Sequence, residues 1–189
     1  MTEFLSTDGS QIADQVTGMT VAAEEVVAAR PEHVWDLVAD VTRVGEWSPE
    51  CVRGTWLSDP GRPQPGARFI GRNRFPDGFE YEVTCVVTEA DRPRAFAWLV
   101  LDDSGDPTRP SSSWRYLIDP LPGGGSKVRQ RFTHGPGYSF LREFAVQAPG
   151  QAAELIAVRR DGLRANMRAT LRAMKAVAES SYSAGVGPG

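Results

Sequence analysis

Among the residues that could do chemistry, His134 is the best suited to moving a proton. It is one of 2 histidines in 189 residues, and it stands directly before Gly135 at the end of an alternating segment. A histidine titrates near neutral pH and can act as a general acid or base. A single histidine near a turn is more often structural or solvated, so its catalytic role is a hypothesis. The other histidine, His33, falls on the exposed part of a first helical turn and is given no role.

Three further polar residues could hydrogen-bond a carbonyl or an enolate oxygen, namely Tyr81, Tyr116 and Asn73. Donors aimed at a developing negative charge stabilise a transition state. The alternative is that these side chains pack in the interior with one polar tip satisfied. Tyr81 and Tyr116 are therefore candidate catalytic residues beside His134, and Asn73 is a candidate ligand-binding residue.

Other catalytic and cofactor motifs are absent from the sequence. It has no GxSxG, HExxH or P-loop pattern, and Gly123–Gly125 precedes a strand, whereas a phosphate loop opens a helix. Cys51 and Cys85 form no CxxC pair, and metal ligation would need more Cys or His than the chain offers. We therefore expect reduced thiols, no metal site and no cofactor.

The composition is that of a single globular domain. The chain is 41% hydrophobic, and its net charge of −3 comes from interspersed charges of both signs. The lack of a basic stripe argues against a nucleic-acid partner. No apolar run approaches the roughly 20 residues of a membrane helix, and the N-terminus lacks the features of a signal peptide. We expect a cytoplasmic protein with no membrane span. The sequence leaves the oligomeric state open, a homodimer included.

Hydrophobic spacing predicts one strand, two short helices and then six strands. The first strand covers Met19–Ala29 and ends at Arg30-Pro31, because proline cannot donate to a sheet ladder. A helix is expected at Pro31–Ala39, and Thr42 is expected to cap a second, one-turn helix at Arg43–Glu46. Alternation with period two predicts the other strands at Val52–Ser58, Ala67–Phe75, Phe79–Thr88, Ala95–Leu101, Ser112–Asp119 and Lys127–His134.

The C-terminal part is predicted to be helical. A short helix is expected at Tyr138–Gln147, and a long amphipathic helix at Gln151–Ser180 follows the interruption at Pro149-Gly150. Gly162, inside the long helix, indicates a kink or close packing, or alternatively room for a ligand. The apolar stripe of this helix comprises Ile156, Leu163, Met167, Leu171, Met174 and Ala178. The basic residues of the helix lie mostly off the stripe and predict a solvated surface; they are Arg159, Arg160, Arg164, Arg168, Arg172 and Lys175.

This order of elements predicts an α+β fold with one long helix covering one face of a sheet. Short turns between successive strands imply an antiparallel meander. We expect a seven-stranded curved antiparallel sheet around the long C-terminal helix, with two short helices after strand 1. The domain is expected at residues 18–180, between a disordered tail at 1–17 and a flexible tail at 181–189.

Alternation also divides each strand into an inner and an outer face. Apolar walls with a few polar anchors are typical of a small-molecule pocket. The alternative is a solid core in which Asn73 and Gln130 satisfy one another, since a buried amide without a partner costs about 1–3 kcal/mol. The candidate ligand-binding residues are Phe69, Asn73, Phe75, Tyr81, Phe96, Trp98, Trp114, Tyr116, Gln130 and Phe132 from the strands, and Met167 and Leu171 from the helix.

Three stretches resemble the START/Bet v 1-like (SRPBCC) superfamily, and within it the polyketide cyclase/dehydrase branch. They are Arg30–Trp35, Asp40–Cys51 and Pro65–Arg74, and the resemblance covers Thr20–Glu179. It implies a helix-grip fold with an apolar cavity between the sheet and the long helix. The stretch Gly135–Gly150 is longer than the family pattern, which suggests a lid or extra packing at the cavity mouth.

The resemblance implies three functional readings, because a fold does not settle a function. In the first, the protein binds an elongated apolar or aromatic molecule and acts as a polyketide cyclase or dehydratase. Catalysis would then come from holding a flexible chain in a reactive shape, with His134 and the tyrosines as proton handlers. In the second, the same cavity carries a lipid or metabolite without chemistry. The third is a regulatory or co-chaperone role, which predicts an inner face packed solid.

Overall fold

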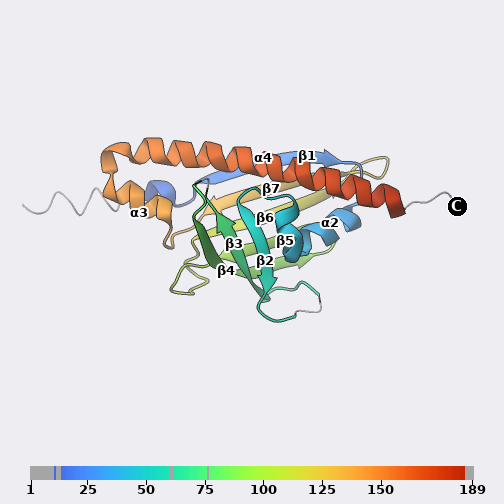
Figure 1. The fold of residues 1–189 in the computed structure, drawn as a ribbon, viewed down its shortest axis with the longest axis horizontal. Coiled ribbons are helices and arrows are strands. Elements are labelled where there is room, and N and C mark those ends of the chain that lie inside the picture. The colour runs from blue at the N-terminus through green and yellow to red at the C-terminus, as the bar shows by residue number, and fades with distance from the viewer. Residues whose placement is uncertain (1–10, 12–13, 60–61, 76, 186–189) are drawn as a thin grey trace, which may run out of the picture.

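A computed structural model describes residues 11, 14–59, 62–75 and 77–185 of the chain. Its centre is one seven-stranded antiparallel sheet with the strand order β1-β7-β6-β5-β4-β3-β2 (Figure 1). The strands are β1 (Thr20–Val27), β2 (Cys51–Trp56), β3 (Arg68–Arg74), β4 (Glu80–Asp91), β5 (Ala95–Val100), β6 (Ser112–Pro120) and β7 (Ser126–His134). The helices are α2 (Pro31–Ala39), η1 (Val41–Glu46), α3 (Phe140–Gln147), η2 (Pro149–Gln151) and α4 (Ala152–Gly185).

The predicted fold class is confirmed, including the two short helices after strand 1 and the long C-terminal helix. The largest change in a strand boundary is in β4, which was expected to end at Thr88 and continues to Asp91. Its last residues pair with the start of β5 beyond a register shift at Thr88, with Ala90 opposite Phe96. A shift of this kind hides the end of a strand from a strict period-two pattern.

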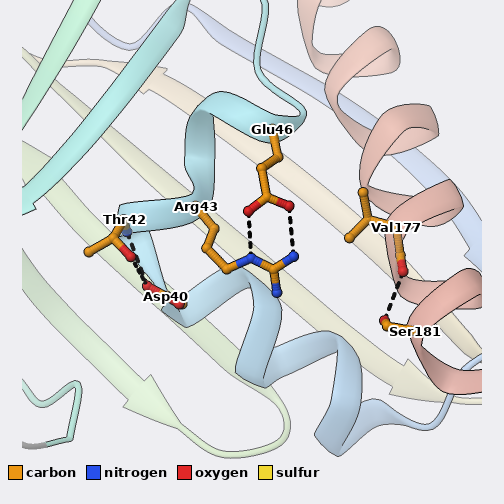
Figure 2. A network of polar contacts seen from close by, with 6 residues as sticks. All are labelled: Asp40, Thr42, Arg43, Glu46, Val177 and Ser181. Atoms are coloured by element: carbon orange, nitrogen blue, oxygen red, sulfur yellow. Dashed lines mark hydrogen bonds and ion pairs between the residues drawn. The ribbon is translucent and has the colours of Figure 1, made fainter. Parts of the chain in front are cut away.

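The short helix η1 begins differently from the prediction. Asp40, and not Thr42, caps it: Asp40 Oδ1 accepts hydrogen bonds from the backbone N of Thr42 at 3.2 Å and from Thr42 Oγ1 at 2.5 Å (Figure 2). The carboxylate also places negative charge at the start of the helix, where the backbone dipole favours it. Arg43 and Glu46 form a two-pronged ion pair on the outside of η1.

Two glycines let η1 lie directly against β2. A Cβ at Gly45 would stand 2.2 Å from the carbonyl oxygen of Val52, and one at Gly54 would stand 2.1 Å from that of Val41. Both contacts are with backbone, which cannot rotate aside. This interlock fixes the connection between η1 and β2, and therefore the position of Glu50 within it.

The long helix α4 packs mainly along β1, at one edge of the sheet (Figure 1). Its predicted stripe is buried from Leu163 onward, whereas Ile156 is only partly buried. Gly162 is exposed, and a Cβ there would meet no atom within 4 Å. Neither close packing nor room for a ligand therefore accounts for this glycine. Among the helices described, none is long and apolar enough to cross a membrane.

Ordered structure extends past both expected domain boundaries. Residues 14–16 are helical, and Val16 is fully buried against Ala145 of α3 and Ala152 of α4. At the other end, α4 continues to Gly185, beyond the expected limit at residue 180. The remaining parts of the two expected tails, apart from residues 11, 14–17 and 181–185, lie outside the described residues.

Candidate ligand-binding site

Aromatic side chains from β3, β5, β6 and β7 form a continuous layer on the inner face of the sheet. Trp98 is at its centre, with ring centroids 6.0 Å from Phe69, 5.7 Å from Phe96, 6.3 Å from Trp114 and 6.0 Å from Tyr116. Phe132 joins through Trp114, at 4.9 Å. We call these six residues the aromatic wall. Alternation predicts Phe69, Trp114, Tyr116 and Phe132 on this face, whereas β5 is apolar on both faces and its pattern does not decide for Phe96 and Trp98.

Part of the aromatic wall is buried in the core, and part of it is reached by solvent. Phe96 and Tyr116 are buried, and Leu163, Met167 and Leu171 of α4 fill the space beneath the helix. Trp98 and Trp114 are only partly buried, because α4 lies over β1 rather than over β5. Part of the inner face is thus packed solid, and solvent reaches the rest at these two indoles.

Surface hollows among the described residues include two whose linings contain none of the six wall residues. One, of about 250 Å³, is lined by Trp35, Trp56 and three aspartates, Asp36, Asp40 and Asp59. The other, of about 110 Å³, is on the outer face of the sheet beside Arg53 and Glu82. Neither contains a residue predicted to bind ligand.

Gln130 and Tyr116 form a polar pair within the wall. Gln130 Nε2 donates to Tyr116 Oη at 2.8 Å, and the two residues face each other across β6 and β7. Burial raises the pKa of Tyr116, so its phenol is neutral and can donate a hydrogen bond. The expected alternative, in which Gln130 satisfies Asn73, is not what the structure has. Asn73 is on β3, opposite Cys51 and Tyr81.

His134 lies at the end of β7, four residues beyond Gln130, and both its ring nitrogens are engaged. Nδ1 is 3.2 Å from the carbonyl oxygen of Gly135, which can only accept, so Nδ1 carries the proton. Nε2 is 3.1 Å from Ser139 Oγ and accepts from that hydroxyl. Ser139 in turn caps α3 by accepting from the backbone N of Arg142. In this arrangement His134 ties α3 to the sheet.

His134 should make stability depend on pH. Burial, helped by the charges of Arg142 and Arg159, lowers its pKa from 6.5 to about 4. Between these two values the unfolded chain binds a proton that the native protein does not. The contribution of neutral His134 to the free energy of unfolding is therefore fully present above pH 6.5, and it is lost as the pH drops toward 4. We expect wild type to lose about 2 kcal/mol more than His134→Asn between pH 7.5 and pH 5 in urea unfolding. Equal losses in the two proteins would contradict this assignment.

A second group of rings lies where α3 packs against the end of β3 and the start of β4, here called the mouth. The ring centroid of Phe140, from α3, lies 5.9 Å from Phe75 and 5.7 Å from Tyr81, edge-on to both. Phe79, 56% exposed, stacks beside them, and Phe144 follows Phe140 on α3. The long stretch after β7 therefore supplies a helix that packs at the mouth, and its role as a moving lid stays a prediction. Phe75 and Tyr81 belong to this mouth group rather than to the aromatic wall.

Glu50, Arg159 and Asn166 join α4 to the start of β2. Arg159 donates to both carboxylate oxygens of Glu50, at 2.7 and 3.2 Å, and Asn166 Nδ2 donates to Oε2 at 3.1 Å. Burial disfavours the charge of Arg159, but the hydrogen bonds and negative charge of Glu50 outweigh it and raise the pKa of Arg159. Burial, together with the charge of Glu50, also raises the pKa of nearby Tyr81 to about 12.

This network corrects the prediction that Arg159 belongs to a solvated surface. The signal was present in the sequence, since Arg159 is three residues after Ile156 and four before Leu163 and so lies on the apolar stripe. Glu50 and Asn166 carried no comparable signal. No cluster of three or more potential metal ligands occurs among the residues that the structure describes.

The comparisons with known proteins agree with this architecture. A family model described as polyketide cyclase/dehydrase and lipid transport matches residues 19–179. The chain belongs to this polyketide cyclase/dehydrase and lipid transport family. The search of curated proteins found no match.

Solved structures of similar fold include other polyketide cyclase-like proteins. Cgl2372 from Corynebacterium glutamicum, described as polyketide cyclase-like, is 29% identical, with 87% of this chain and 94% of that one covered and a TM-score of 0.61. The Zhui aromatase/cyclase from Streptomyces sp. R1128 is 18% identical, with 89% and 98% covered and a TM-score of 0.64. The di-domain aromatase/cyclase BexL from the BE-7585A pathway is also 18% identical, with 90% of this chain and 53% of BexL covered and a TM-score of 0.63. The last two likenesses concern the fold alone.

Proposed function

We propose that the chain binds a flat apolar or aromatic small molecule against the aromatic wall. The observation that carries this proposal is the partial exposure of Trp98 and Trp114 on a face whose other rings are largely buried. Exposed aromatic surface inside a fold is favourable to cover, at about 25 cal/mol per Å² of apolar area removed from water. Tyr116 and Gln130 are the polar anchors of the wall, and Phe75, Tyr81 and Asn73 lie together at the mouth group.

Calorimetric titration with 2-naphthol, a flat two-ring probe, tests this proposal. We expect saturable binding of one molecule per chain, with a negative heat-capacity change from the burial of apolar surface. A titration without saturation up to the solubility limit of the probe would contradict it.

Polyketide cyclisation or dehydration is the second candidate, and two tyrosines, the buried Tyr116 and the half-buried Tyr81, favour it. Such a reaction removes a proton next to a carbonyl and gives one to a departing hydroxyl. Tyr116 and Tyr81, held neutral by their raised pKa, can donate hydrogen bonds to a carbonyl or enolate oxygen. His134, uncharged at neutral pH, could accept a proton once Ser139 releases Nε2. Unchanged product formation from a linear poly-β-ketone by His134→Ala would remove His134 from this role.

Carriage without chemistry uses the same wall and needs none of these proton transfers. A carrier tolerates the loss of Tyr116 and His134, whereas a cyclase does not. The regulatory reading gains support only from the packed part of the inner face beneath α4, and the partly exposed indoles of Trp98 and Trp114 argue against it.

A further inference from the structure

The side chain of Gln130 has a buried acceptor without a partner. Its Nε2 donates to Tyr116, but Oε1 receives no hydrogen bond from the described residues. Gln130 and Tyr116 are each only 5% exposed. A buried carbonyl oxygen that has lost its water and found no donor lowers stability, so native proteins rarely keep one without a reason.

The hydroxyl of Tyr116 supplies a hydrogen-bond donor beside this free acceptor. Its oxygen accepts from Gln130, and its proton has no acceptor among the described residues. A free donor and a free acceptor thus stand on paired positions of β6 and β7. A hydroxyl group on a ligand can accept from the one and donate to the other. A ketone or ether oxygen can only accept, and would leave Gln130 Oε1 unsatisfied.

The Gln130–Tyr116 pair lies at the boundary between two hydrophobic clusters of the inner face. On β7, Val128 belongs to one buried apolar cluster and Phe132 to another, and Gln130 lies between them. Met167 of α4 packs in the second cluster, beside Phe132 and the partly buried Trp114. Methionine is unbranched and flexible, so it can move aside for a ring that slides along the wall. The polar pair is then within reach from the open side at Trp114.

We propose that the ligand is a hydroxylated aromatic molecule, a phenol or naphthol, whose hydroxyl lies between Tyr116 Oη and Gln130 Oε1. This inference rests on the proposed function. It specifies that the ligand carries a hydroxyl group, and it specifies where that group binds.

Two probes of nearly equal size, 2-naphthol and 2-fluoronaphthalene, test the inference by calorimetry. Fluorine cannot donate, and it makes the probe more hydrophobic, so partitioning alone favours 2-fluoronaphthalene. We expect wild type to bind 2-naphthol at least about tenfold more tightly, the effect of one satisfied buried acceptor. Gln130→Met should reduce this preference, because it removes the acceptor for the ligand's hydroxyl and leaves only Tyr116 Oη to bind it.

Gln147→Met is the matched control, because it makes the same change at an exposed position of α3 and should keep the preference intact. Tyr116→Phe provides a second variant, which keeps the ring and loses the donor, and it should also reduce the preference. Gln130→Met also removes the hydrogen bond that Tyr116 Oη accepts, so circular dichroism and the thermal midpoint must show that the variant is folded.

The outcomes separate the inference from the proposed function. If wild type binds both probes with equal affinity, or prefers 2-fluoronaphthalene, the hydroxyl site is overturned and the apolar site stands. If wild type binds neither probe, both are overturned. A preference for 2-naphthol that persists in Gln130→Met and Tyr116→Phe would also overturn the assignment to this pair.

Discussion

Gly71→Leu is expected to lower the affinity for 2-naphthol by about a hundredfold while the protein stays folded. Gly71 is buried on the inner face of β3, two residues after Phe69 of the aromatic wall. A Cβ there would meet Val83, Cys51 and Cys85 at 3.5–3.9 Å, which is ordinary van der Waals contact. The first carbon of a side chain therefore fits. The rest of a leucine must extend away from the sheet, into the space that the ligand would occupy.

Gly71→Ala is the matched control for this prediction. It adds only the carbon that fits, so it should keep the affinity for 2-naphthol within about threefold of wild type. Circular dichroism and the thermal midpoint report whether both variants are folded. Wild-type affinity in a folded Gly71→Leu would show that the ligand does not lie along this part of β3.

Gly54→Ala is expected to lower the free energy of unfolding by about 3 kcal/mol or more. The added Cβ would stand 2.1 Å from the carbonyl oxygen and 2.8 Å from the carbonyl carbon of Val41. These are backbone atoms, so η1 as a whole must move off β2. The move would also displace Glu50 and weaken its ion pair with Arg159.

Gly162→Ala makes the same chemical change with the opposite expected sign. It lies on the exposed side of α4 with open space around it, so alanine should stabilise the helix by about 1 kcal/mol. Urea unfolding of both variants gives the comparison. Equal stability of Gly54→Ala and wild type would mean that η1 does not lie against β2 in solution.

The fold was predictable because its signals are periodic and local. Strands joined by short turns alternate with period two, and this pattern alone places Trp114, Tyr116 and Phe132 on one face. The helical stripe was equally clear, since Leu163, Met167 and Leu171 are all at most 1% exposed. Both patterns depend on neighbours within a few residues, which the sequence contains directly.

The site was less predictable because its contacts join distant parts of the chain. Alternation placed Gln130 inward, but only the register of β6 and β7 shows that its partner is Tyr116 and not Asn73. Glu50 and Arg159 are 109 residues apart, and no local pattern connects them. The cap at Asp40 was missed for a simpler reason: aspartate and threonine both cap helices well, and they stand two residues apart.

The indole N–H signals of the five tryptophans test the central claim most directly, because they report on different parts of the molecule. Trp98 and Trp114 belong to the aromatic wall. Trp35 and Trp56 line the hollow beside α2, and Trp47 is buried next to η1. In a ¹H–¹⁵N spectrum titrated with 2-naphthol, we expect the signals of Trp98 and Trp114 to shift together and saturate, while that of Trp47 stays in place. Shifts confined to Trp35 and Trp56, with Trp98 and Trp114 unmoved, would contradict a binding site on the inner face of the sheet.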